Sequence, residues 1–284
     1  MDSLARELAT LSASEMVTAL GVKNAPALLR RGLALPFFAA SRPLGETLAQ
    51  LDHGILPQGL AFSAHRALER FGVELRQSGD DEAALDGPRL LLANHPGAYD
   101  ALALMSVIAR DDLLILAADR GFLRALPRLS QHLVFVGQTP GERAGALKRA
   151  VSALRRGGAV LHFPAGEIEP DADFEGDAER LLSRWQPGIS ALLEACAKVD
   201  GRVVLAGVRG VHSPRAKRWR VNRWAERRGI TTLSPLLQLV GRLRDVVTRV
   251  RLDDAGPAKQ HAELTRDQQL LGLRERLRQA ILRA

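Results

Sequence analysis

The stretch from Leu90 to Asp100 constrains the fold more than any other part of the sequence. It begins with a short apolar run, Leu90 to Ala93, which is typical of a buried strand. Pro96 and Gly97 break that run and force a turn, and an apolar helical pattern starts at Asp100. We therefore predict a strand, a tight turn and a helix that begins at Asp100, where the helix N-terminus favours a carboxylate.

This turn brings a histidine and a carboxylate within reach of each other. His95 follows the strand and Asp100 opens the helix. A carboxylate can fix the tautomer of an imidazole and stabilise its protonated form, so that the imidazole takes a proton from a hydroxyl group. The alternative is that Asp100 only caps the helix and His95 is an ordinary turn residue. The position of His95 at the C-terminal end of a strand favours a role as a base, because active sites form at these ends in parallel α/β sheets.

A second strand followed by a turn lies further along the chain. The apolar run Ala159 to Leu161 leads into the sequence Phe163-Pro164-Ala165-Gly166-Glu167-Ile168-Glu169. Taken alone, this is a turn at the end of a strand. Taken together, the two turns resemble two motifs of the glycerolipid acyltransferase family. Asn94, His95 and Asp100 match the first motif, N-H-x-x-x-x-D, and the stretch from Phe163 to Glu169 is similar to the third, F-P-E-G-T-R-S. The resemblance covers roughly Leu90 to Asp253.

The resemblance implies an enzyme that moves an acyl group from a thioester to a hydroxyl group. His95 would be the general base and Asp100 would orient it, without a covalent serine step. The chain has no G-x-S-x-G motif, which argues against an α/β-hydrolase. Backbone N–H groups of the turn or of Gly166 would face the thioester oxygen. The residues that we expect to bind the substrates are Asn94, Gly97, Arg120, Arg124, Phe163, Pro164, Ala165, Gly166 and Glu167.

The third motif departs from the family pattern. Ala165 replaces the family glutamate, and Glu167 and Ile168 stand in place of threonine and arginine. In the family that arginine contacts the acceptor phosphate, so an acceptor without phosphate becomes an alternative. Arg120, Arg124 or Arg143 would otherwise supply the contact, since a guanidinium fork fits a phosphate group. We expect the acidic stretch 167–179 to be a solvated loop, with Glu167 beside the motif as a recognition residue for an amino-bearing acceptor.

The charge balance indicates anionic partners. The formal net charge is +8, which suits lipid head groups, phosphorylated substrates or nucleic acid. The stretch 215–228 alternates basic residues with Trp219 and Trp224, which suits an anionic membrane surface, single-stranded nucleic acid or a solvated basic loop. The segment 25–40 is apolar with flanking arginines, and it either lies in the membrane interface or forms part of a helical pair packed on the core.

The alternation of strand and helix patterns predicts an α/β fold with a mixed, mostly parallel central sheet flanked by helices and preceded by an N-terminal helical segment. We divide the chain into an N-terminal helical segment with possible membrane contact (1–75), an acyltransferase α/β domain (76–256) and a C-terminal amphipathic helix packed on it (257–284). The lone Cys196 lies in a core helix and excludes an internal disulfide.

The chain has neither a signal peptide nor a stretch of the roughly 20 apolar residues that span a bilayer. We therefore expect a cytoplasmic protein, peripheral on the inner face of the membrane. Its histidines show no metal-binding spacing, so we expect no metal and no cofactor apart from acyl-CoA or acyl carrier protein as co-substrate. The expected acceptor is a glycerolipid or lyso-phospholipid hydroxyl. The alternatives are an acyltransferase for a non-phosphate acceptor and a catalytically inactive lipid- or nucleic-acid-binding protein.

Overall fold

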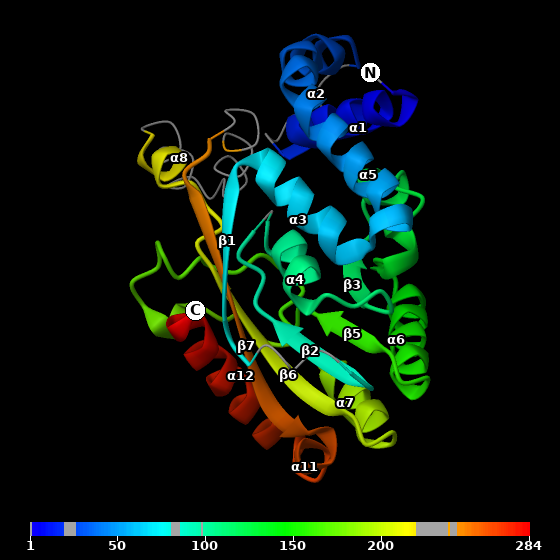
Figure 1. Ribbon diagram of the computed structural model, residues 1–284, viewed down its shortest axis with the longest axis vertical. Coiled ribbons are helices and arrows are strands. Elements are labelled where there is room, and N and C mark those ends of the chain that lie inside the picture. The colour runs from blue at the N-terminus through cyan, green and yellow to red at the C-terminus, as the bar shows by residue number, and fades with distance from the viewer. Residues whose placement is uncertain (1, 20–26, 81–85, 98, 220–237, 239–242) are drawn as a thin grey trace.

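A seven-stranded sheet forms the centre of the computed structural model, which describes residues 2–19, 27–80, 86–97, 99–219, 238 and 243–284 (Figure 1). The strand order is β1-β7-β6-β2-β5-β3-β4. The strands are β1 (Val73–Gly79), β2 (Arg89–Ala93), β3 (Leu114–Ala118), β4 (Leu133–Val136), β5 (Ala159–His162), β6 (Arg202–Arg209) and β7 (Val246–Pro257). Only the β6–β7 pairing is antiparallel, so the prediction of a mixed, mostly parallel α/β sheet is confirmed.

Helices cover both faces of this sheet. The helices near the N-terminal half of the chain are α1 (Ser3–Ala19), α2 (Ala27–Gln58), α3 (Leu60–Phe71), α4 (Asp100–Ile108) and α5 (Gly121–Arg124). The others are α6 (Pro140–Arg155), α7 (Ile189–Ala197), α8 (Pro214–Arg218), α11 (Ala258–Ala262) and α12 (Arg266–Arg283), and short 3₁₀ helices span Leu129–His132 and Ala178–Arg180. One apolar core lies under α1 to α4 and the second under α6, α7, α11 and α12.

Strand β2 shows why the sheet is buried on both sides. Its side chains alternate between the two faces, as the period of a strand requires. Leu91 and Ala93 enter the first core, whereas Leu90 and Leu92 enter the second. All four are fully buried. A continuous apolar run therefore becomes a central strand here, as predicted.

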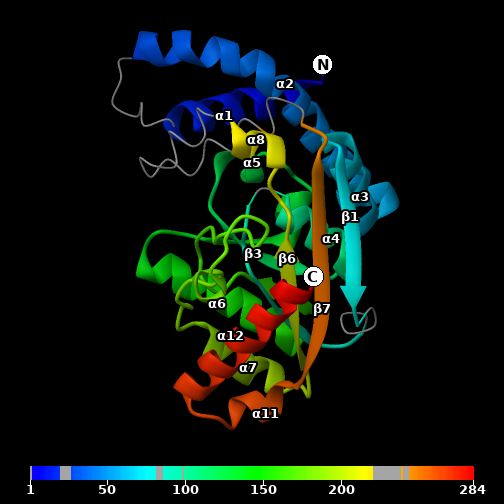
Figure 2. The ribbon, with the colours of Figure 1, turned by 90° about the vertical axis from the view of Figure 1, so that its left-hand side faces the viewer.

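The helices of the N-terminal segment lie together at one end of the sheet. In Figures 1 and 2, α1 runs alongside α2, and α2 continues to α3. Gly45 permits this close approach, because a Cβ on it would lie 2.4 Å from the Ala5 carbonyl oxygen. Among the described residues, no helix combines the length and apolar character needed to cross a membrane. Whether α2 residues 27–40 lie in a membrane interface stays a prediction.

The C-terminal helix α12 packs directly on the sheet. It contacts β6 and β7 and buries its apolar stripe in the second core, through Leu273, Leu277, Ala280 and Ile281. Gly207 of β6 lies under this helix, since a Cβ there would come within 2.5 Å of the α12 backbone at Ala280 and Ile281.

Some predicted segments differ from the structure in detail. The sequence pattern over 72–76 predicts a short strand, and β1 continues beyond it to Gly79 because its whole length pairs with β7. Cys196 is buried in α7, as expected. The pair Ser234-Pro235 is typical of a helix start, and this predicted start lies outside the described residues. Positions 220–228 of the basic tryptophan-containing stretch also lie outside them.

Candidate active site

His95 and Asp100 meet across the turn between β2 and α4. The His95 Nδ1 atom lies 2.7 Å from Asp100 Oδ2. The Asp100 side chain is 1% exposed and the His95 side chain 31% exposed, so the imidazole faces the surface and the carboxylate lies behind it. With Nδ1 bonded to Asp100, the Nε2 atom is the ring nitrogen that a substrate can reach. The geometry is that of a base steered by a carboxylate.

Asp100 also shapes the turn that carries His95. Its Oδ2 atom accepts the Gly97 N–H at 2.9 Å and its Oδ1 atom accepts the Ala101 N–H at 2.5 Å, at the first turn of α4. Gly97 packs closely against His212, because a Cβ on it would lie 3.1 Å from the His212 ring. The prediction that a helix-start carboxylate reaches back to the histidine therefore describes the structure correctly.

Asn94 holds the end of β2 against β6 and does not face a substrate. Its side chain is fully buried. The amide donates to the Val208 carbonyl and accepts the Val208 N–H, each at 2.8 Å, and so extends the strand pairing by one step. The expectation that Asn94 binds substrate is wrong, because both of its polar groups are occupied and neither is accessible.

The turn after β5 lies against the histidine, as the motif pair predicts. The rings of Phe163 and His95 are 4.8 Å apart. β2 and β5 are neighbouring parallel strands, so their C-terminal ends bring the two turns together. Gln186 secures the second turn by donating to the carbonyl oxygens of Pro164 and Ala165. Glu167 is exposed at its rim.

The expected oxyanion donors are already engaged. The Gly97 N–H is held by Asp100, and the Gly166 N–H donates to the Phe163 carbonyl at 3.1 Å. Ala165 is buried, so this part of the motif shapes the turn and does not line an open surface. These two N–H groups are therefore occupied in this conformation, and the expectation that backbone N–H groups near the turn face the thioester oxygen stays a prediction.

The two predicted arginines lie at the same edge of the sheet, after β3. Arg120 precedes α5 and is exposed. Arg124 makes a forked ion pair with Asp119, at 2.5 and 2.7 Å, and stacks on Phe135 at 4.5 Å. Because β5 lies between β3 and β2, neither arginine contacts His95. Their expected role in binding phosphate stays a prediction, and Arg124 would have to leave Asp119 to fulfil it.

Two carboxylates in the acidic stretch are buried, which contradicts the prediction of a solvated loop. Glu169 is 3% exposed and accepts the backbone N–H groups of His95, at 3.0 Å, and Ser183, at 2.8 Å. Asp171 is 4% exposed and accepts the N–H groups of three residues after β6, Gly210 to His212. These residues satisfy buried backbone donors. In the sequence, the only signal for them was their position at the end of the third motif and directly after it.

The electrostatics of the site favour a charged histidine. Burial lowers the pKa of His95, but the Asp100 carboxylate, through its charge and hydrogen bond, and the Glu169 charge raise it, and the net pKa lies above its ordinary value. Burial raises the pKa of Glu169 to about 7, against the hydrogen bonds from Ser183 and His95. Among the described residues there is no cluster of side chains that would hold a metal ion.

A second histidine, which sequence reasoning missed, packs against the turn. His212 is buried beside Gly97, and its Nδ1 atom has no hydrogen-bond partner. Burial lowers the pKa of His212, so its ring stays neutral near pH 7. It thus serves as a neutral wall of the turn, and His95 alone carries the exposed imidazole of the site.

Fold and site together define an α/β protein with a carboxylate-steered histidine at the carboxyl ends of parallel strands. Residues 74–204 match the family model described as Acyltransferase. This part of the chain is thus similar to the acyltransferase family, in agreement with the resemblance seen in the motifs.

Comparison with individual proteins adds one structure. The chain is similar to the crystal structure of the 1-acyl-sn-glycerophosphate (LPA) acyltransferase, PlsC, from Thermotoga maritima, at 13% sequence identity and a TM-score of 0.48. The similarity covers 98% of this chain and 91% of that one. No curated protein matched the sequence.

Proposed function

We propose that this protein is an acyltransferase, which moves a fatty acyl group from an acyl thioester to a hydroxyl group of a glycerolipid or lyso-phospholipid. The observation that carries the proposal is the contact of His95 Nδ1 with the buried Asp100 carboxylate, within the segment that matches the family. The donor is acyl-CoA or acyl carrier protein. Both are anionic, and the net charge of +8 suits either.

The reaction follows from the placement of the histidine. His95 Nε2 takes the proton of the acceptor hydroxyl while its oxygen attacks the thioester carbonyl carbon. Asp100 stabilises the imidazolium that forms. When the tetrahedral intermediate collapses, the carbon–sulfur bond breaks, the ester remains on the acceptor, and the imidazolium returns its proton to the leaving thiolate. Neither a metal ion nor a cofactor takes part in this proposal.

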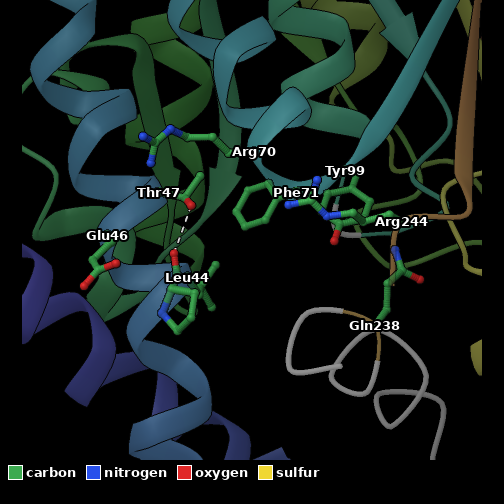
Figure 3. A pocket seen from close by; sticks show the side chains of 9 residues that line it. Leu44, Glu46, Thr47, Arg70, Phe71, Tyr99, Gln238 and Arg244 are labelled. Atoms are coloured by element: carbon green, nitrogen blue, oxygen red, sulfur yellow. Dashed lines mark hydrogen bonds between the residues drawn. The ribbon is translucent and has the colours of Figure 1, made fainter. Parts of the chain in front are cut away.

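A cavity of about 300 Å³ near the site suits part of the lipid acceptor (Figure 3). Its walls include Leu44 of α2 and the rings of Phe71 and Tyr99, whose centroids are 5.5 Å apart. Tyr99 is the residue before Asp100. β7 starts at the end of the sheet where β6 and β2 finish, so Arg244, which precedes β7, lies at the same end of the sheet as the turn that carries His95.

Two arginines give this cavity a cationic rim. Arg70 at the end of α3 and Arg244 before β7 both line it, with Glu46 of α2 paired to Arg42 at 3.1 Å. In this proposal the anionic head of the acceptor binds Arg70 and Arg244. They take over the role of the family arginine that Ile168 replaces. A guanidinium suits this role because its planar fork binds two phosphate oxygens.

We expect acyl transfer to a lysophosphatidate and weaker transfer to the monoacylglycerol with the same chain. The double variant Arg70→Gln/Arg244→Gln should raise the KM for lysophosphatidate about tenfold or more, since a hydrogen bond to a charged group contributes about 1.5–3 kcal/mol. The KM for monoacylglycerol should stay unchanged. Product formation by mass spectrometry and thiol release with a thiol-reactive dye check both.

The matched control is Arg66→Gln, an exposed α3 arginine paired with Glu69 outside this cavity. An equal rise in KM for both acceptors in the double variant would contradict the arginine assignment. Lysolipid binding without thiol release, from either donor, would instead support the second candidate function, lipid binding without turnover. The engaged N–H groups of Gly97 and Gly166 favour that candidate.

A mixed apolar and basic surface borders the site and suits an anionic membrane. Ile168, Phe174 and Trp219 are exposed. Lys217 Nζ lies 5.6 Å from the Phe174 ring, which joins α8 to the acidic loop. Ile168 adjoins Glu169, the residue bonded to His95. Aromatic and basic side chains together are typical of residues at a lipid head-group layer. In our proposal the enzyme works on the cytoplasmic face of the membrane through this surface.

The double variant Phe174→Ala/Trp219→Ala should bind vesicles with anionic lipids several-fold more weakly than the wild type. Both proteins should bind less at high salt, because the basic part of the surface is screened. Sedimentation with vesicles checks this, and Phe62→Ala, an equally exposed aromatic on α3, is the control. If the Phe62 variant lost as much binding as the double variant, this surface would have no special role.

A further inference from the structure

The Glu169 residue is joined to His95 by its backbone as well as by its side chain. Glu169 Oε2 accepts the His95 N–H at 3.0 Å, and the His95 carbonyl oxygen accepts the Glu169 N–H at 2.8 Å. The two hydrogen bonds close a ring that fixes the His95 peptide on both sides. The other carboxylate oxygen, Oε1, accepts the Ser183 N–H at 2.8 Å. The segment beneath the histidine therefore has three hydrogen bonds centred on one residue.

Glu169 is buried between elements that carry positive charge. It is 3% exposed. The charged groups that face it are His95, on the β2–α4 turn, and Arg274, on α12, and the charges of both lower its pKa against the effect of burial. Arg274 is itself held in place because it donates to the Leu182 carbonyl, next to Ser183. A carboxylate fixed in this way cannot turn away from the histidine when the charge on the imidazole changes.

This arrangement matters most at the moment of proton transfer. The imidazole gains a positive charge when it takes the acceptor's proton. Asp100 contacts the ring directly, and Glu169, whose pKa is raised to about 7 by burial, adds a second negative charge behind the peptide when it is ionised. In a buried environment such a charge is screened less than in water, so it stabilises the imidazolium at longer range.

We propose that Glu169 is a positioning residue for the catalytic histidine: its buried carboxylate fixes the His95 main chain in line with Asp100 and stabilises the imidazolium that forms during acyl transfer. The proposal rests on the proposed function, in which His95 is the base. It assigns to the third motif a role in holding the catalytic base, in addition to its expected role in binding the acceptor.

The test is the variant Glu169→Gln, which keeps the size of the side chain. Its amide cannot accept from both Ser183 and His95 through equivalent oxygens, and it carries no charge. We expect kcat to fall about tenfold or more with little change in the KM for the thioester. The acid limb of the pH profile should move to lower pH, because the charge that raises the His95 pKa has been removed. An acid limb that coincides with that of the wild type would overturn the proposal.

Asp171→Asn is the matched control. Asp171 is a similarly buried carboxylate two residues away that holds the backbone of Gly210 to His212. Its loss should reduce stability without moving the acid limb. An equal shift in both variants would show that the effect is structural and would overturn the proposal.

An NMR titration of the His95 ring separates this proposal from the proposed function, since it needs no turnover. The ring should titrate at a lower pH in Glu169→Gln than in the wild type. If Glu169→Gln does not fold, the titration of the wild-type protein alone tests the proposal. Coupling requires the His95 ring signals to shift as Glu169 titrates near pH 7, and a His95 curve that fits one independent group would reject the role. If the His95 ring titrates at a lower pH in the variant but the wild type transfers no acyl group, only the proposed function is rejected.

Discussion

Replacing His95 with alanine is expected to lower kcat/KM for acyl transfer by about a thousandfold or more, which is the range for loss of a general base. The fold should be retained, because the His95 side chain is partly exposed and lies at the edge of the core. Thiol release from an acyl thioester, measured with and without a lysolipid acceptor, gives the rate. Thermal unfolding of the variant at nearly the wild-type temperature would show that the loss is chemical.

The pH dependence of the wild type belongs to the same expectation. His95 must be neutral to accept a proton, and its pKa lies above the ordinary value because of Asp100 and Glu169. Activity should therefore fall as the pH drops through that raised pKa, and the fall should begin at a higher pH than for an unperturbed imidazole. The control is His65→Ala, an exposed histidine on α3 that contacts Ser106. Substantial residual transfer in His95→Ala would reject His95 as the base.

The sequence was sufficient to predict the local part of this site. The apolar run, the breaking turn and the helix start all lie between Leu90 and Asp100, so pattern and spacing determine how His95 and Asp100 meet. The same holds for the strand before Phe163. These contacts are set by the geometry of a single β-strand, turn and helix, for which the sequence carries clear signals.

The contacts that fix the site from outside were not predictable in this way. Asn94 pairs with Val208, 114 residues further along the chain, and Glu169 reaches back 74 residues to His95. Which strand lies beside β2, and in which register, depends on the packing of the whole sheet. A carboxylate in a polar stretch is usually solvated, and only the buried backbone donors around Glu169 and Asp171 reverse that expectation.

The second large expected effect is on stability, and it comes from a glycine in the sheet. Gly207→Ala should lower the free energy of unfolding by about 2–3 kcal/mol, since the added methyl group has to force α12 away from β6. A Cβ at this position would lie 2.5 Å from the backbone of Ala280 and Ile281, and backbone cannot move aside as a side chain can. In a chain of this size the melting temperature should fall by roughly 4–10 °C.

A glycine-to-alanine substitution in α12 itself, away from its contact with β6, supplies the control. Gly272 of α12 is exposed and has no atoms within 4 Å of a built Cβ. Gly272→Ala should therefore stabilise the protein by about 0.5–1 kcal/mol, through helix propensity alone. Opposite signs for the two variants in urea unfolding would show that α12 is part of the folded unit. Arg274 faces Glu169 from this helix, so Gly207→Ala should also move the acid limb of the pH profile. Equal stability of the two variants would mean that α12 is only loosely attached, and Arg274 could then not hold its position behind the catalytic turn.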